Sequence, residues 1–563
     1  MLIGVDVGTG SARAGVYDPL GRLLGLGKHP VTMWHEPGEI VEQSSDQIWQ
    51  AVCTAVRGAL AASGVAASAV QGIGFDATCS LVAVGPDGAG LAVGPSGDPA
   101  RNVIVWMDHR AQGEAKEINA GGHAVLDYVG GSISPEMETP KLLWLARNQP
   151  ATFAAARHFF DLSDYLTWRA TGNPARSSCT VTCKWTYLAH EGRWDADYFR
   201  AVGLGSLADE GFARIGTEVV SPGTPLGGLT AISAADLGLV AGVTVGAALI
   251  DAHAGGLGTL GVRLPDADAD PTRRLAYIFG TSACSMISTR TATPVPGVWG
   301  PYYDAMLPGL WLNEGGQSAA GAALDHLVHL HRDAPLIALE AAAGGKSLIA
   351  HVASHAVGLA PTLSDLVRVA GEIIVVPEFL GNRSPFAEPE ARAVISGLGF
   401  DRGLDSLAAL YLAGLAGIGY GLRQLLDRAK DRGIVISTII ASGGAAQSPL
   451  ACQMLADSTG ITVALPDEPE PVLLGASMLA AIACGLYADA DTAMQAMSGR
   501  AQIFRPARAE IEMIHAARFA AFTVLQDAGR HLKRSTALRE PNRLTVRKAG
   551  GRKAGCDDSS GRR

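Results

Sequence analysis

The chain has 563 residues, of which 48% are hydrophobic and 18% are charged. That length exceeds one ordinary hydrophobic core and suits two domains of similar size, while the apolar content excludes a largely disordered protein. The formal net charge of −9 argues against a protein that binds nucleic acid through its phosphates.

Basic residues gather at the C-terminus. Positions 530–563 hold eleven Lys or Arg against three acids, so the body before them carries a charge of −17. An acidic body favours solubility, and we expect a cytoplasmic protein. The segment 531–563 is basic and poor in apolar residues, which predicts a disordered tail. A membrane or nucleic-acid contact of this tail is the alternative interpretation.

The eight cysteines are scattered, without a C-x-x-C pair, which indicates reduced thiols. Cys179 and Cys183 stand close together but lack further ligands at zinc spacing, so we expect buried side chains there. We find no targeting signal at the start of the chain. The apolar run 406–422 is shorter than the roughly 20 residues of a membrane helix and predicts a buried helix.

The chain opens with a predicted hairpin. An apolar run at 2–5 leads into the turn DVGTGS at 6–11, and a second run continues to Tyr17. Glycines in such a turn let consecutive N–H groups approach an anion. A single glycine-rich loop is more often an ordinary turn, and the Lys-Ser or Lys-Thr ending of a P-loop is missing here.

Strands and helices are then predicted to alternate. We expect strands at 69–74 and 103–106 and a helix that begins at 140, a spacing typical of α/β proteins. Asp108, His109 and Arg110 directly follow the second of these strands. A polar cluster of this kind is, by itself, more often a solvated loop than a binding site.

An acidic residue is predicted where a strand passes into a helix. The run of small and β-branched residues at 242–250 ends at Asp251, and AHAGG follows. Ligand chemistry in open α/β sheets gathers at such strand ends. Asp251 could instead serve only as the helix N-cap. The segment 261–274, with PDADADP at 265–271, predicts the domain boundary.

The second half repeats the opening design. A strand at 275–279, the turn Gly280-Thr281-Ser282 and a strand at 284–287 follow the first hairpin by 272 residues. Two such turns facing each other could hold one triphosphate. Further on, a strand at 434–441, the turn SGGAAQS at 442–448 and a helix at 449–459 present a helix N-terminus suited to a nucleotide.

These segments, in this order, resemble the FGGY carbohydrate kinases from about residue 2 to about residue 526. The segments that carry the resemblance are GFDATCS at 74–80, WMDHRA at 106–111, CKW at 183–185, DAHAG at 251–255, EGGQS at 314–318 and GNRSP at 381–385. The resemblance implies an α/β fold of two ribonuclease H-like, actin-like ATPase domains, at 1–262 and 272–530. The active site is expected in the cleft between them.

The resemblance also implies roles for individual residues. Asp251 is expected to accept the proton of the attacking sugar hydroxyl. ATP and Mg²⁺ are the expected cofactors, with Asp6 and Asp251 holding the metal largely through water. The expected nucleotide-binding residues are Gly8, Thr9, Ser11, Arg13, Gly280, Thr281, Ser282, Gly443, Gly444 and Ser448. The expected sugar-binding residues are Thr78, Ser80, Trp106, Asp108, His109, Lys184, Asp251 and Glu314. Trp106 could also be plain core.

Within the family, the chain is most similar to pentulose kinases that act on D-ribulose. The resemblance therefore implies ATP-dependent phosphorylation of a terminal hydroxyl, with L-ribulose or a pentitol such as ribitol as alternative substrates. A non-catalytic actin-like nucleotide module is the alternative from another class. An ATPase chaperone would need a substrate-binding domain, which the 33 residues after 530 cannot supply. Expected partners are the sugar and ATP, without nucleic acid or membrane, and a homodimer is compatible with the sequence.

Overall fold

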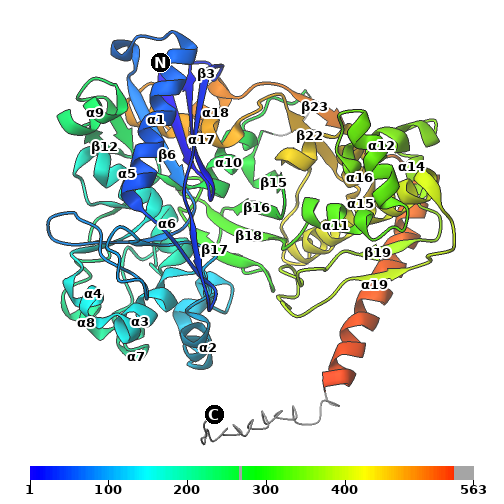
Figure 1. Ribbon diagram of the computed structural model, residues 1–563, viewed down its shortest axis with the longest axis horizontal. Coiled ribbons are helices and arrows are strands. Elements are labelled where there is room, and N and C mark those ends of the chain that lie inside the picture. Colours follow the sequence, from blue (N-terminus) through cyan, green and yellow to red (C-terminus); the bar gives the residue numbers. More distant parts are fainter. Residues whose placement is uncertain (266–268, 538–563) are drawn as a thin grey trace, which may run out of the picture.

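The computed structural model describes residues 1–265 and 269–537, which form two halves, each built on a mixed sheet (Figure 1). The first sheet has the order β12-β13-β6-β1-β2-β3, and β14 pairs with β6 beside β13. Its strands are β1 Leu2–Val7, β2 Ser11–Tyr17, β3 Leu23–Pro30, β6 Gly72–Ala77, β12 Pro225–Gly228, β13 Thr244–Gly246 and β14 Leu249–Ile250.

The second sheet has the order β17-β18-β16-β15-β21-β22-β23. Its strands are β15 Arg274–Phe279, β16 Ala283–Thr289, β17 Trp299–Tyr303, β18 Trp311–Gln317, β21 Thr438–Ser442, β22 Thr462–Pro466 and β23 Ala501–Phe504. In each sheet an antiparallel hairpin is followed by parallel strands: β1 pairs with β2 and β6, and β15 pairs with β16 and β21. The two halves therefore share one topology, as the repeated hairpins predicted.

Helices cover both sheets. In the first half, α1 Ser45–Ser63 packs on β2 and β3, and its first turn is capped by Ser44, which accepts a hydrogen bond from the Gln47 N–H. The other helices of this half are α2 Gln112–Ala120, α3 Glu138–Asn148, α4 Pro150–Ala155, α5 Leu162–Thr171, α6 Ser178–Lys184, α7 Ala196–Ala201, α8 Gly205–Asp209, α9 Ala231–Leu237 and α10 Asp251–Leu260. Smaller sheets join β4 Trp34–Glu36, β5 Ile40–Gln43, β7 Leu81–Val84, β8 Val103–Ile104 and β9 His158–Asp161, and β10 Arg176–Ser177 with β11 Val219–Val220.

The core of the second half surrounds helix α15 Gly403–Lys430. Within residues 1–265 and 269–537, α15 is the single unbroken helix that is long and apolar enough to cross a membrane, but 72% of its most apolar window is buried in the molecule. The prediction of a buried helix at 406–422 is confirmed. The remaining elements are α11 Gly321–His329, α12 Ala334–Ala343, α13 Leu348–Ala356, α14 Leu366–Val369, β19 Ile374–Val376, β20 Val394–Ser396, α16 Pro449–Thr459, α17 Pro471–Ala483, α18 Ala490–Met497 and α19 Glu510–Ala537.

Several predicted boundaries were wrong. The strand expected at 69–74 is β6, Gly72–Ala77, because residues 67–69 form a short 3-10 turn and the pairing with β1 runs on to Ala77. The strands expected at 103–106 and 434–441 are shorter at one end. The helix predicted at 449–459 is confirmed as α16.

The end of the chain also differs from the prediction. Helix α19 continues to Ala537, so the first residues of the expected disordered tail 531–563 are helical. Residues 538–563 lie outside the described residues. The seven cysteines within the described part of the chain are unpaired, as expected, and Cys179 and Cys183 are buried.

Helix α17 joins the two halves. In sequence it lies between β22 and β23 of the second sheet, yet it packs against β1 and β6 of the first sheet and against α10 (Figure 1). Gly4 on β1 permits this contact, because a side chain there would overlap the backbone carbonyl of Leu473. A division of the chain at 262 and 272 therefore separates the two sheets but leaves α17 packed on the first.

Candidate active site

A cavity of about 440 Å³ opens between the two halves. Its wall includes the ends of β1, β6 and β14 from the first half and of β15, β16 and β18 from the second. The predicted site residues that line it are Asp6, Gly8, Thr9, Ser11, Arg13, Thr78, Trp106, Lys184, Asp251, Ser282 and Glu314. The fold therefore brings most of the predicted set to one place.

Three carboxylates meet where the parallel strands end. In the register of the first sheet, Asp6 on β1 stands opposite Asp76 on β6, and Asp76 stands opposite Leu249 on β14, two residues before Asp251. Asp76 is fully buried, and neither of its carboxylate oxygens has a hydrogen-bond partner. Burial, and then the negative charges of Asp6 and Asp251, raise the pKa of Asp76 well above its usual range. Three acidic side chains are thus crowded at this strand edge.

Asp251 is the first residue of α10. The N-cap position belongs to Ile250, and the Asp251 carboxylate accepts a hydrogen bond from the adjacent Ala252 N–H at 2.7 Å. An N-cap side chain would bond two or three residues further along, so Asp251 is not the cap. Burial, and then the charge of Asp6, raise its pKa to about 6. The group is still ionised at neutral pH and is a stronger base than an ordinary aspartate.

Each hairpin turn is closed by a backbone hydrogen bond from its first glycine, but the second turn is one residue shorter than the first. In the first turn the Gly8 N–H donates to the Ser11 carbonyl at 3.1 Å, and in the second the Gly280 N–H donates to the Ser282 carbonyl at 2.9 Å. Ser282 lines the cavity, whereas Gly280 and Thr281 do not. Their carbonyls instead accept N–H groups at the start of α11, which fixes the second turn to that helix.

Arg13 is held by two acids at the mouth of the first turn. Its guanidinium donates to Asp6 and forms an ion pair with Glu470 at 2.6 Å. Glu470 is the N-cap residue of α17 and was not predicted from the sequence. Arg13 is still 30% exposed and lines the cavity, so it remains accessible to an anion there.

The predicted adenosine residues lie beside the second turn. Gly443 follows β21 with φ 90°, and a side chain there would press on the backbone of Phe279, the last residue of β15. Ser448 caps α16 by accepting a hydrogen bond from the Ala451 N–H at 3.4 Å. Gly443, Gly444 and Ser448 do not line the 440 Å³ cavity. They lie at the same sheet edge, one strand further along.

The other end of the cavity is lined by aromatic and charged side chains. Trp106 donates from its indole N–H to Thr9 Oγ1 at 3.0 Å, so it lies at the cavity wall and not in the core. Trp299 also lines the cavity, and its ring centre lies 5.7 Å from Lys184 Nζ and 5.3 Å from the guanidinium carbon of Arg383. These cations flank one aromatic face.

Glu314 is kept ionised by buried cations. Burial alone would raise its pKa, but Lys184 and then His253 lower it to about 2. His253 approaches Glu314 at 3.4 Å and the Cys179 thiol at 3.1 Å. Burial opposes the charged imidazolium, yet Cys179 and Glu314 raise its pKa to about 10. Glu314 is therefore a fixed hydrogen-bond acceptor at this end of the cavity.

Known families match both halves of the chain. The model of the N-terminal domain of the FGGY family of carbohydrate kinases matches residues 1–258, and that of the C-terminal domain matches residues 275–484. The chain belongs to the FGGY family. This FGGY kinase thus has the two-domain α/β fold that its sequence predicted.

Individual relatives agree with the family models. An FGGY carbohydrate kinase domain-containing protein of Danio rerio is 43% identical over 96% of this chain and 99% of its own. The D-ribulokinase YDR109C of Saccharomyces cerevisiae is 36% identical, over 85% of this chain and 71% of its own. A xylulose kinase structure from Rhodospirillum rubrum has a TM-score of 0.77 at 22% identity, covering 94% of this chain and 99% of that one.

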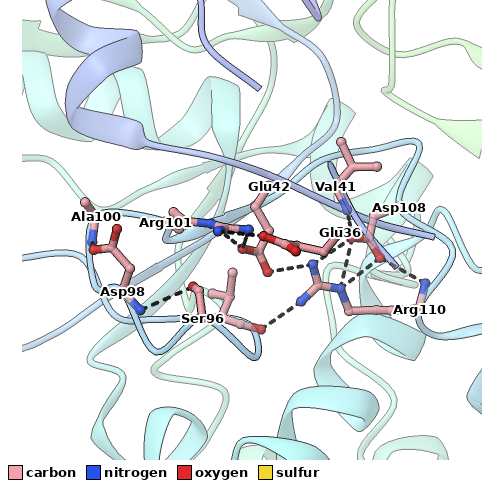
Figure 2. Close-up of polar contacts among 10 residues, drawn as sticks. Glu36, Val41, Glu42, Ser96, Asp98, Ala100, Arg101, Asp108 and Arg110 are labelled. Atoms are coloured by element: carbon pink, nitrogen blue, oxygen red, sulfur yellow. Dashed lines mark hydrogen bonds and ion pairs between the residues drawn. The ribbon is translucent and has the colours of Figure 1, made fainter. Parts of the chain in front are cut away.

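Asp108 was predicted at the sugar, but in this FGGY kinase its carboxylate lies outside the cavity. It is fully buried and accepts hydrogen bonds from the Val41 N–H at 2.6 Å and from the Arg110 guanidinium (Figure 2). Arg110 also pairs with Glu42, which in turn binds Arg101. In the structure these internal partners surround the acid, and its role at the sugar stays a prediction.

His109 and Ser80 also miss the cavity wall. His109 contacts Glu136 at 3.3 Å, and Glu136 lines the cavity in its place. Ser80 is fully buried and accepts a hydrogen bond from the Trp106 N–H at 3.1 Å. His109 and Ser80 therefore contact side chains that line the cavity without lining it themselves. Their sequence positions beside Asp108 and Thr78 did not distinguish such a supporting position from a lining one.

Other lining residues of the FGGY kinase were not predicted. Arg383 belongs to the segment 381–385 that carried the resemblance, so a signal for it was present in the sequence. Glu136 and Trp299 lie in loops and strands without a motif. Each reaches the cavity only through the packing of segments that are distant in sequence.

The acid cluster fits a magnesium ion bound through water. Asp6, Asp76 and Asp251 lie near the same strand edge, and the buried carboxyl oxygens of Asp76 have no hydrogen-bond partner. In the part of the chain that the structure describes, no three His, Cys, Asp or Glu side chains converge as a direct metal cage. Mg²⁺ keeps several of its waters and binds few carboxylates, which agrees with such a site.

Proposed function

We propose that this FGGY kinase phosphorylates the terminal hydroxyl of D-ribulose with ATP and produces D-ribulose 5-phosphate. The observation that carries the proposal is the position of Asp251. It lines one cavity together with the first hairpin turn, Ser282 of the second turn, and charged and aromatic side chains.

The geometry suits phosphoryl transfer. Residues 8–11 of the first turn and Ser282 of the second line the cavity, where their free backbone N–H groups and hydroxyls would meet phosphate oxygens, and Arg13 adds positive charge. Asp6 and Asp251 would hold Mg²⁺ through water, which neutralises charge on the phosphates when bound. Asp251 takes the proton from the sugar hydroxyl as that oxygen attacks.

The sugar wall suits a neutral polyhydroxyl compound. Glu136 and Glu314 can accept hydrogen bonds from sugar hydroxyls, and Lys184 and Arg383 can donate them. The two acidic and two basic side chains leave this wall without a net charge. Trp106 and Trp299 provide apolar faces for the carbon chain. Similarity to the yeast D-ribulokinase supports D-ribulose among such compounds. L-ribulose and ribitol are the alternatives.

Coupled ADP release tests the proposal. Purified protein with MgATP is assayed with D-ribulose, L-ribulose, ribitol, xylulose, glycerol and gluconate, and the D-ribulose product is identified by mass spectrometry and NMR. We expect the highest kcat/KM with D-ribulose. A higher value with another sugar would reassign the substrate.

The same assay distinguishes a sugar kinase from a protein that only binds nucleotide. An actin-like module that only binds nucleotide would release ADP at a rate independent of every sugar, or not at all. That result would overturn the kinase proposal as a whole.

A further inference from the structure

Arg383 brings positive charge to the sugar end of the cavity from the second half of the molecule. Its guanidinium lies over the Trp299 ring and 3.9 Å from the Cys284 thiol, and it forms no ion pair within residues 1–265 and 269–537. Its charge lowers the pKa of both Glu136 and Glu314. Arg383 therefore lines the part of the cavity that we assign to the sugar, an assignment that rests on the proposed function.

The loop that carries Arg383 is closed on itself. Asn382 and Glu388 exchange two backbone hydrogen bonds, at 2.9 and 2.8 Å, so residues 382–388 form a compact turn. The Asn382 side chain donates to Glu378 at 2.6 Å and accepts from the Phe386 N–H at 3.0 Å. These hydrogen bonds tie the loop together, so contacts that hold Glu388 and Glu378 in place also restrict the position of Arg383.

Helix α19 holds this loop from outside at two points. Arg530 forms two parallel hydrogen bonds to the Glu388 carboxylate, at 2.8 and 2.5 Å, and its guanidinium lies 4.0 Å from the centre of the Phe386 ring. One helical turn earlier, the Gln526 amide donates to Glu378 at 2.6 Å. A two-bond contact between arginine and carboxylate fixes orientation as well as distance.

We propose that α19 sets the affinity of the enzyme for its sugar, with Arg530 as a positioning residue that keeps Arg383 over Trp299. This helix lies beyond residues 275–484, the part matched by the family's C-terminal domain. Its action is specific to the sugar end, since the loop contacts β18 beside Glu314, where Ser384 Oγ accepts the Gly316 N–H at 3.3 Å.

The test replaces Arg530 by Gln and measures KM for D-ribulose and for ATP separately. Removing the pair frees the loop, so we expect KM for the sugar to rise about threefold to tenfold, with KM for ATP and kcat within about twofold of wild type. Glu388→Gln should have the same effect, and the double variant should add little to either single change.

Glu510→Gln is the matched control. Glu510 also lies on α19 and pairs with an arginine, Arg368, but this pair is exposed and does not contact the 382–388 loop. Its KM values should equal those of wild type. Thermal unfolding of each variant reports whether the fold is kept. If Arg530→Gln does not fold, Glu388→Gln breaks the same pair and decides the question.

Two results would overturn the inference. One is a sugar KM unchanged in Arg530→Gln and Glu388→Gln. The other is an equal rise of the KM for ATP, which would show general damage. In either case, sugar phosphorylation by the wild-type protein would leave the proposed function intact. If the wild-type protein phosphorylates no sugar, the proposed function itself is wrong.

Discussion

At the scale of single residues, the proposed mechanism depends on the ionisation of Asp251. The carboxylate must be unprotonated to accept a proton, and its pKa is raised to about 6 by burial and by Asp6. We therefore expect kcat/KM to be constant above this pKa and to fall tenfold per pH unit below it. A pH profile of kcat/KM for the sugar, measured on the wild type with saturating MgATP, tests this fall at acidic pH.

Asp251→Asn removes the base while keeping the shape of the side chain. We expect turnover to fall by about a hundredfold or more, and the remaining activity to lose the acidic limb near pH 6. ATP affinity, measured by titration calorimetry, should change little. A variant with unchanged turnover would assign the base to another residue.

Replacing Asp108 tests whether this acid stabilises the fold or binds the sugar. Because Asp108 is one of two acids paired with the buried Arg110, Asp108→Ala leaves that cation with Glu42 alone and leaves the Val41 N–H without its acceptor. We expect the free energy of unfolding to fall by about 3 to 5 kcal/mol, measured by urea denaturation. The sugar KM of the folded fraction should stay near that of wild type. A large rise of that KM without loss of stability would return Asp108 to the sugar site.

At the scale of elements, the crossing of α10 and α17 fixes the base in place. The two helices pack at glycines: a side chain at Gly475 on α17 would overlap the backbone carbonyl of Ala254 on α10, and one at Gly258 on α10 would overlap that of Pro471. Asp251 begins α10, so a shift of that helix moves the carboxylate. Close backbone contact here serves the position of the catalytic group.

Gly475→Ala tests this dependence. The added methyl group must push α10 and α17 apart, so we expect a loss of about 1 to 3 kcal/mol of stability and a fall in kcat larger than the loss of folded protein. Gly113→Ala is the control, because Gly113 lies within helix α2 with open space around it, and alanine should be neutral or stabilising there. Equal kcat in the two variants would contradict the role of the crossing.

The sequence predicted the elements whose signals are local. Both hairpin turns follow from glycines between apolar runs, and Asp251 from a strand that ends in an acid. The place of α17 could not be predicted, since its residues are apolar on nearly every face and do not indicate which sheet it covers. The internal partners of Asp108 could not be predicted either, because polarity alone does not reveal that Val41 and Arg110 surround it.

At the scale of the whole molecule, the site is an interface between two copies of one topology. The first half contributes Asp6, Asp251 and one turn, and the second contributes Ser282, Glu314 and Arg383. Neither half contains a complete set. Residues such as Arg383 and Glu136 could not be assigned roles from sequence, because their neighbours come from segments on opposite sides of the cavity.

The central claim is that both turns hold one triphosphate with its last phosphate facing Asp251. A crystal structure with a non-hydrolysable ATP analogue, Mg²⁺ and D-ribulose tests it most directly. We predict the β- and γ-phosphates between residues 8–11 and 280–282, and the terminal sugar hydroxyl in hydrogen-bond contact with the Asp251 carboxylate. A triphosphate bound away from both turns, or a sugar out of reach of Asp251, would contradict the account.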